Sequence, residues 1–350
     1  MKARTRLVSF VGFGLVSLAA CSKSQQAAPA AAAPAAPAAA AAPAGELKPA
    51  AATQAVAPST PPAASSGEDA GKLKVKVFTA SPEGFLVNAT LVSGDKDAVL
   101  IDAQFQLSDA KHLAEQIKET KKHLTTIYVT HWHPDHYFGA GVLKEAFPDA
   151  KVVALPATVH EIKKTWEAKV KQWQPIFKEN IPAKPLIPEP LTGTVLTVEG
   201  KSLEITGKVQ GDSEDNSFVY IPTLKTVITG DIVYDGVYPW TAETTPAQRK
   251  AWAGTLDKIA ELKPETVVPG HQKPDAADKP ASLQFMKDYL AAYDEAISSS
   301  KTAADAQSKV KAKYNDLALD IILKIGTDAA YKKHPEHAGT TKKPEQPAKK

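Results

Sequence analysis

The chain has 350 residues, of which 43% are hydrophobic and 23% are charged, and its formal net charge is +3. A charge this small, without a basic stripe interleaved with aromatic residues, argues against a nucleic-acid-binding protein. The only cysteine is Cys21, so a disulfide scaffold is excluded. The length allows one large domain with appendages.

The first 21 residues have the pattern of a secretory signal. Three positive charges precede an uncharged run from Leu7 to Ala20, which is too short for a final membrane span. The run ends in Leu18-Ala19-Ala20-Cys21, which resembles the lipobox of bacterial lipoproteins. An ordinary signal peptide with an accidental cysteine is the alternative.

The lipobox resemblance implies an address. Cleavage before Cys21 and acylation of that residue would tether the protein by lipid in the periplasm, and Ser22 after it indicates the outer membrane. Residues 22–70 contain 22 alanines and 8 prolines but one leucine and one valine, so residues 22–71 are predicted to be a disordered tether. The rest is divided into a domain at 72–300, a C-terminal helical extension at 301–337 and a disordered basic tail at 338–350.

The domain shows two rounds of β-rich runs and helical patterns. The first round predicts, in chain order, strands at Leu73–Phe78, Phe85–Val92 and Ala98–Ile101, a helix at Ser108–Thr120, a strand at Thr126–Val129, a helix at Val142–Phe147, a strand at Lys151–Leu155 and a helix at Thr158–Phe177. The second predicts strands at Thr194–Val198, Leu203–Thr206, Ser217–Ile221 and Thr226–Thr229, a helix at Pro246–Leu262, a strand at Thr266–Val268 and helices at Ser282–Ser298 and Ala303–Ile325. This order favours an α/β fold in which two sheets pack face to face with helices outside both.

The motif that carries chemistry is Thr130-His131-Trp132-His133-Pro134-Asp135-His136, directly after a predicted strand. Imidazole and carboxylate groups bind zinc, and also iron or manganese when oxygen donors increase. His131 and His133 alternate, so both can point to one ion, whereas Asp135 and His136 lie a turn further on and can serve a second. A chance polar loop is the alternative, but three clustered histidines would repel when protonated and lose hydration when buried.

A histidine-rich HxHxDH motif after a strand resembles the signature of the metallo-β-lactamase superfamily, whose fold is an αβ/βα four-layer sandwich with the metal site at one edge. The resemblance covers roughly Leu73 to Asp275. It implies a bridging carboxylate at Asp231, which ends Val227-Ile228-Thr229-Gly230-Asp231, and a last histidine at His271, which ends Val267-Val268-Pro269-Gly270-His271.

One position departs from that pattern. The family usually has Gly-His-Ser/Thr where this chain has Gly211-Asp212-Ser213, and no histidine occurs from 161 to 270. Asp212 could ligate the first metal with His131 and His133, or the site could be catalytically silent. In the third alternative the first site is weak, and one metal is held by the remaining ligands, Asp135, His136, Asp231 and His271.

The resemblance implies a metal-dependent hydrolase in which water activated by one or two Zn²⁺ ions attacks an ester, lactone, thioester or amide. Iron or manganese are alternatives to zinc. The implied catalytic roles are bridging for Asp231 and nucleophile orientation for Asp135, and Tyr234 is the best candidate for a substrate-contacting hydroxyl. The zinc β-lactamases of the commonest type have cysteine at the bridging position, so Asp231 favours an esterase-like activity over a true β-lactamase.

The expected partners are a small-molecule substrate and a membrane, and no nucleic acid. Two other classes stay open, a mononuclear-iron oxygenase of the same fold and a catalytically silent periplasmic lipoprotein. Several aromatic residues near the motifs could wall an apolar cleft or cover the edge of the core: Trp132, Tyr137, Phe138, Tyr238 and Trp240. On the helix at Thr158–Phe177, Trp166 and Trp173 could cap such a cleft.

Overall fold

The computed structural model describes residues 72–274 and 276–333. The lipobox with Cys21, the tether at 22–71 and the tail at 338–350 lie outside the described residues. In the first half the elements are β1 (Lys74–Thr79), β2 (Asn88–Ser93), β3 (Asp97–Ile101), α1 (Leu107–Glu119), β4 (His123–Val129), α2 (Ala140–Ala146), β5 (Lys151–Ala154), α3 (Pro156–Phe177) and β6 (Glu189–Pro190). In the second half they are β7 (Val195–Val198), β8 (Lys201–Val209), β9 (Asn216–Ile221), β10 (Thr226–Ile228), β11 (Tyr234–Asp235), α4 (Pro246–Glu261), β12 (Thr266–Val268), β13 (His271–Gln272), α5 (Ala281–Ser298), α6 (Ala303–Lys313) and α7 (Asp320–Lys333).

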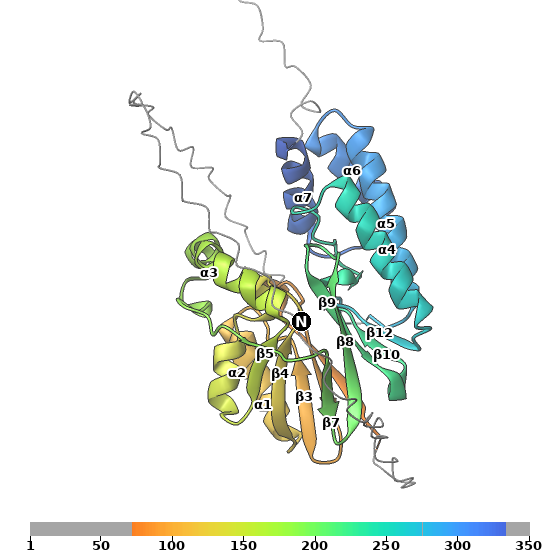
Figure 1. Cartoon of the computed structure of the whole chain (residues 1–350). Helices are drawn as coiled ribbons and strands as arrows, with labels where there is room; N and C mark the ends of the chain where they lie inside the picture. Colours follow the sequence, from red (N-terminus) through yellow and green to blue (C-terminus); the bar gives the residue numbers. More distant parts are fainter. Residues whose placement is uncertain (1–71, 275, 334–350) are drawn as a thin grey trace, which may run out of the picture. The chain divides into compact units, whose positions relative to one another are not determined.

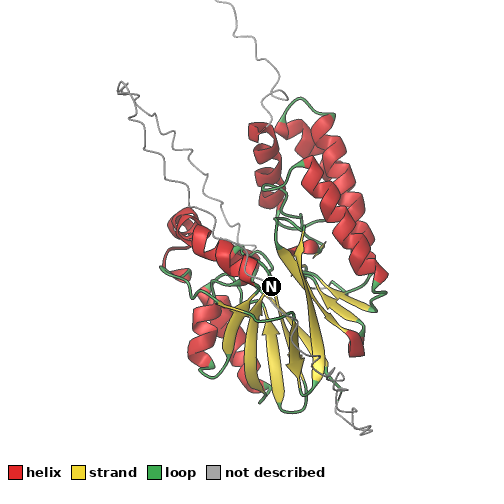
Figure 2. Cartoon of the chain, in the orientation of Figure 1, coloured by secondary structure: helices red, strands yellow, loops and turns green. Residues whose placement is uncertain are grey.

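The strands form two main sheets (Figure 2). The first has six strands in the order β1-β2-β3-β4-β5-β6, and the second has five in the order β12-β10-β9-β8-β7. Helices α1 to α3 lie beside the first sheet and α4 and α5 beside the second (Figure 1). A short parallel pair, β11 with β13, joins the loops that follow β10 and β12.

Three apolar layers hold these elements together. Leu113 and Ile117 of α1 pack with Leu100 on one face of the first sheet, and Val99 on the opposite face packs against Val219 of the second sheet. Another cluster joins the outer face of the second sheet to α4 and α5, through residues that include Trp252, Leu256 and Met286. Successive side chains of β3 therefore enter two different cores, as expected for a strand that is buried on both faces. The predicted αβ/βα four-layer sandwich is confirmed.

Two predicted elements differ from the structure. The strand predicted at Phe85–Val92 begins only at Asn88, because Phe85 and Leu86 take left-handed φ values of 62° and 54°. The single helix predicted at Ala303–Ile325 is wrong, since α6 and α7 are separate helices. Between them Ala318 leaves the helical path and pairs its backbone N–H with the carbonyl of Gly236, and its carbonyl accepts from Tyr238 N–H. This tertiary pairing outweighs the local helical pattern. Among the described residues, no helix is long and apolar enough to cross a bilayer.

The topology brings several strand ends to one edge. Strands β3 and β4 are parallel, as are β10 and β12, so the residues that follow each pair leave the sheet side by side. Strand β9 runs antiparallel to β10, so the loop before β9 reaches the same edge. Asp102, the histidine motif, Asp212, Asp231 and His271 all follow or precede these strand ends.

A glutamate links the two sheets at a hairpin. Glu199, in the turn between β7 and β8, accepts hydrogen bonds from the backbone N–H groups of Asp95, Lys96 and Asp97 at 3.0, 2.5 and 2.9 Å. Asp95 and Lys96 lie in the turn between β2 and β3, and Asp97 is the first residue of β3. The bonds from Asp97, Lys96 and Asp95 lower the pKa of Glu199 from 4.5 to about 2.

Since the pKa of Glu199 is lowered by folding, the ionised carboxylate stabilises the fold above about pH 4.5, and that contribution disappears as the pH falls through about 2. We therefore expect Glu199→Gln to lower the free energy of unfolding at pH 7, and the difference from the wild type to vanish towards pH 2. Urea unfolding at a series of pH values measures this difference. Glu204→Gln on β8, which removes an exposed carboxylate of the same hairpin, is the control. A pH-independent difference would contradict the assignment.

Candidate metal centre

Seven ionisable side chains meet at this edge of the sandwich. They form two groups that share Asp231, and the ligand atoms of each group lie within 4.8 Å of one another. The first group is His131, His133, Asp212 and Asp231; the second is Asp135, His136, Asp231 and His271. The structure therefore brings together every metal ligand that the sequence suggested, including Asp212.

Glycines allow the ligand loops to approach so closely. Gly230 takes a left-handed φ of 49°, and a Cβ there would lie 2.7 Å from Thr130 Oγ1. A Cβ at Gly270 would overlap the Asp231 carboxylate. From the first sheet, Asn88 donates from its side-chain nitrogen to the Pro269 carbonyl at 2.9 Å and so holds the His271 turn. Any larger residue at the two glycines would push the ligand loops apart.

Within the first group, the placement of His131 points to a metal ion. His131 Nε2 is fully buried and has no hydrogen-bond partner among the described residues. Its nearest carboxylate oxygens, Asp231 Oδ2 and Asp212 Oδ1, are 3.8 and 3.9 Å away. A tetrahedral ion with ligand atoms about 2.1 Å away holds them roughly 3.4 Å apart. The orphaned nitrogen and these separations fit a metal ion.

In the second group, both histidines lie closer to carboxylates than His131 does. His136 Nε2 lies 3.0 Å from Asp231 Oδ1, and His271 Nε2 lies 3.3 Å from both Asp231 Oδ2 and Asp135 Oδ2. Asp135 is 17% exposed, in contrast to the other members of the site, which are buried. It is therefore the ligand that an entering water or substrate meets.

Asp212 is held from both sides. Asn216 donates to Asp212 Oδ1 at 3.2 Å, and the Tyr234 hydroxyl donates to Asp212 Oδ2 at 3.3 Å. His133 Nδ1 lies 2.7 Å from the same Oδ2. Burial, together with the nearby charge of Asp231, raises the pKa of Asp212 to about 6. The carboxylate thus faces His131 and His133 at the position where the family pattern has histidine.

Partners outside the ligand set hold three of the four histidines through Nδ1. Asp102, which has a left-handed φ of 65°, accepts from Thr130 Oγ1 at 2.9 Å and from His136 Nδ1 at 2.8 Å. Thr130 Oγ1 in turn lies 3.0 Å from His131 Nδ1. The carbonyl of Phe85 accepts from His271 Nδ1 at 2.7 Å. In His131, His136 and His271 the Nε2 atom therefore faces the site. This is the usual arrangement of metal-binding histidines, in which one ring nitrogen binds the metal and the other is held by a hydrogen-bond partner.

His133 is oriented differently. Its Nδ1 faces the site, and its Nε2 lies 2.8 Å from Glu243 Oε2. Glu243 also pairs with Lys169 of α3 at 2.9 Å. Sequence reasoning missed both Asp102 and Glu243. A carboxylate directly after a buried strand was a usable signal for Asp102, whereas Glu243 lies 110 positions from His133 and has no local signature.

The carboxylates set the charge of the site. Burial opposes the protonation of His133, but Asp212 and Glu243 outweigh it and raise the pKa of His133 to about 10. Burial likewise opposes protonation of His271, whose pKa Asp231 and Asp135 raise to about 10. The same negative field attracts a metal ion, which must displace these protons, so metal affinity should rise with pH. With neutral histidines and three ionised aspartates, two divalent ions would leave a net charge of +1.

The aromatic residues fall into three environments. Tyr137 and Phe138 are completely buried in the core. Trp132 packs on His133, with ring centroids 4.5 Å apart. Others line a cleft above the ligands, namely Trp173, Tyr234, Tyr238 and Trp240. The Tyr234 hydroxyl donates to Asp231 Oδ2 at 2.7 Å, so it positions the shared carboxylate, and its contact with a substrate stays a prediction.

The comparisons agree with this geometry. The model of the metallo-beta-lactamase superfamily matches residues 82–271, more than half of the chain, so the protein belongs to that superfamily. The chain is 24% identical over 194 residues to "Metallo-beta-lactamase type 2" of Bacillus cereus, which covers 55% of this chain and 69% of that relative. A crystal structure of a metallo-beta-lactamase family protein from Thermus thermophilus has a TM-score of 0.55 and 21% identity, and covers 75% of this chain and 93% of that chain. This last likeness shows the fold.

The predicted superfamily is therefore confirmed. Family and site together define an enzyme of the metallo-hydrolase type with a buried histidine and aspartate site. The two groups of ligands could each hold a metal ion.

If Asp212 is a ligand, exchanging it for imidazole changes metal preference. We expect Asp212→His to tighten Zn²⁺ binding at the first group and to raise the preference for Zn²⁺ over Mn²⁺ by about tenfold, because imidazole suits zinc and carboxylate suits manganese. Competition with a chromophoric chelator, using each metal in turn, measures both constants. Asp212→Asn keeps the shape of the side chain and removes its charge, so it should lower the affinity for both Zn²⁺ and Mn²⁺. Equal affinities in all three proteins would show that Asp212 does not bind metal.

Proposed function

We propose that the protein is a metal-dependent hydrolase that uses metal-activated water on an ester, lactone, thioester or amide. The observation that supports it is the sharing of Asp231 by two ligand groups, which suits two adjacent ions. We propose zinc as the metal, with iron or manganese as alternatives, since each group has two histidines and two carboxylates.

Metal ions bound here would supply an acidified water and polarise the carbonyl of the substrate. The remaining roles belong to side chains. Asp135, partly exposed at the edge of the second group, can orient the attacking water through its carboxylate oxygens. Burial and the charges of Asp212 and Asp231 raise the pKa of Tyr234 well above its ordinary value. Tyr234 therefore stays protonated and acts as a donor to Asp231, not as a base.

The substrate is proposed to be esterase-like. Zinc β-lactamases of the commonest type have a cysteine at the bridging position, whereas this chain has Asp231 there. The Bacillus cereus relative is named a β-lactamase, so a β-lactam, which is a cyclic amide, belongs in the test panel. It is not the favoured substrate.

Metal analysis followed by activity assays tests the proposal. We expect close to two metal ions per chain, hydrolysis of at least one ester, lactone, thioester or β-lactam, and loss of activity with chelator. His133→Ala should remove about one ion per chain and lower kcat/KM more than about 100-fold. Loss of a residue that only hydrogen-bonds to a metal ligand usually costs less than this. His123→Ala removes an exposed histidine that pairs with Asp97, and should change neither.

Other outcomes of this experiment separate the alternatives. One iron per chain with oxygen consumption would favour the oxygenase, and no metal with all ligands intact would favour a silent lipoprotein. Full activity and metal content in His133→Ala would contradict the ligand assignment.

We also propose that Cys21 anchors the mature protein by lipid in the periplasm, at the outer membrane. The support is the lipobox-like sequence alone. Expression of the full chain in a Gram-negative bacterium should place it in the membrane fraction, and Cys21→Ser should abolish acylation. Incorporation of labelled fatty acid and fractionation measure the two effects. Equal labelling of both proteins would contradict the anchor.

A further inference from the structure

An apolar cleft lies directly over the metal ligands. Its floor includes His133, Asp135, Asp212, Asp231 and His271. Because the floor is made of the candidate metal ligands, a substrate that occupies the cleft is held next to the site where we propose hydrolysis takes place. The side chains of the walls therefore carry information about the substrate.

The first wall is aromatic. Phe85, Phe105 and Trp173 line it. The ring centroid of Phe85 lies 5.5 Å from that of Phe105 and 5.5 Å from that of Trp173. The centroids of Phe105 and Trp173 are 5.8 Å apart. Phe105 is fully buried, whereas Phe85 and Trp173 are partly exposed. The rings brace one another and present fixed apolar surface to the cleft.

The second wall comes from the loop after β11, from the residue before α7 and from the first turn of α7. Tyr238, Trp240, Leu319 and Ile322 line it. The hydroxyl of Tyr238 donates to the Tyr314 carbonyl at 2.6 Å, so the tyrosine offers the cleft its ring. Both walls are therefore hydrocarbon in character.

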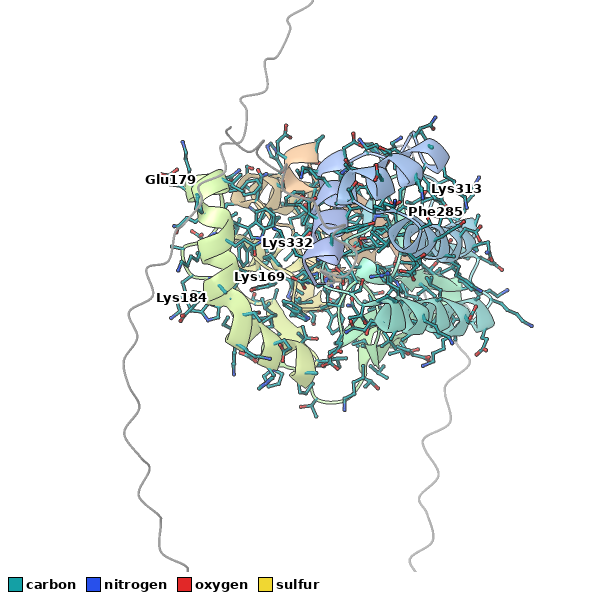
Figure 3. The ribbon with its side chains drawn as sticks, turned by 90° about the horizontal axis from the view of Figure 1, so that it is seen from above. Lys169, Glu179, Lys184, Phe285, Lys313 and Lys332 are labelled. Carbon is teal, nitrogen blue, oxygen red and sulfur yellow. The ribbon has the colours of Figure 1, made fainter. Side chains whose placement is uncertain are left out.

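Polar groups on the walls are few. Apart from the floor residues, the tyrosines and the indole nitrogen of Trp240, which has no hydrogen-bond partner among the described residues, the polar lining is Lys169 and Gln172, both on α3. Figure 3 shows Lys169 on the side of α3 that faces the C-terminal helices. Its ammonium is 2.9 Å from Glu243 and 4.7 Å from the ring centre of Trp132, so its charge is already balanced. Sugars, nucleotides and polar peptides would find little to hydrogen-bond there.

We infer that the cleft binds a hydrocarbon chain, and that the substrates are esters, thioesters or lactones of medium- or long-chain acyl groups. The inference rests on the proposed hydrolase activity of the same site. Water oxygen forms the new bond to the acyl carbon, and the bond from that carbon to the leaving oxygen or sulfur breaks. One proton of the water goes to the leaving alcohol or thiol, and the other is released when the carboxylic acid ionises.

The first test is a series of p-nitrophenyl esters, from acetyl to decanoyl, with the metal-loaded protein. Each added methylene buried in the cleft should raise kcat/KM about two- to fourfold until the cleft is filled. Trp173→Ala should lower kcat/KM for the decanoyl ester more than tenfold and leave the acetyl ester within twofold. Trp166→Ala is the matched control, because Trp166 lies on the same helix but lines a separate groove.

The second test does not depend on hydrolysis. Titration calorimetry with octan-1-ol should show saturable binding to the wild type and to Trp166→Ala, and at least tenfold weaker binding to Trp173→Ala. Circular dichroism and thermal melting check that both variants are folded. If Trp173→Ala is misfolded, octan-1-ol binding by the wild type, compared with ethanol, decides the question.

The outcomes separate the two proposals. Hydrolysis that favours the acetyl ester, without octan-1-ol binding, would overturn the acyl-chain inference and leave the hydrolase intact. Octan-1-ol binding without hydrolysis of any ester, thioester or lactone would support an apolar ligand and overturn the proposed function.

Discussion

The structure depends on the burial of most of a cluster of seven ionisable side chains, in which six surround the carboxylate of Asp231. Burying charged or polar groups without partners costs several kcal/mol each, roughly, so such a cluster persists only when every group has a counterpart. Here Asp231 faces three histidines and accepts from Tyr234. Three buried atoms of the cluster, His131 Nε2, His136 Nε2 and Asp231 Oδ1, have no hydrogen-bond partner among the described residues. The arrangement is that of a site completed by cations.

The sandwich meets this requirement through its strand order. Two parallel pairs and one antiparallel neighbour deliver the ligand loops to a single edge, although the ligands span residues 131 to 271. The apolar layers on both sides keep the strands in register, and Gly230 and Gly270 remove the Cβ atoms that would separate the loops. Packing far from the site therefore decides the spacing of its ligands.

The site contains one more carboxylate than the family pattern predicts. With aspartate in place of a neutral histidine, Asp212 subtracts one charge from the centre, and Tyr234 and Asn216 hold the carboxylate in place. Less net positive charge on the ions makes a bound water less acidic. The apolar walls above act in the opposite direction, because exclusion of water strengthens the electrostatic interactions beneath them.

How much could be predicted depends on the range of each interaction. The strand before His131, the HxHxDH spacing and the Gly-Asp and Pro-Gly-His turns are local, so they predicted the fold and the candidate ligands without coordinates. Asp212 was found by its place in the chain order, and a shared site with His131 and His133 was one of three alternatives that the sequence left open. The break between α6 and α7 was missed because Ala318 pairs with a loop some 80 positions away.

The sequence by itself therefore determined the family, the ligand types and the departure at position 212, because these are written in short contiguous patterns. Only the tertiary structure decided which histidine nitrogen faces the site, since that depends on Asp102, Glu243 and the Phe85 carbonyl. It also decided that Trp173 of α3 and Ile322 of α7 line one cleft. Such contacts join residues far apart in the chain, and the packing of whole layers selects them.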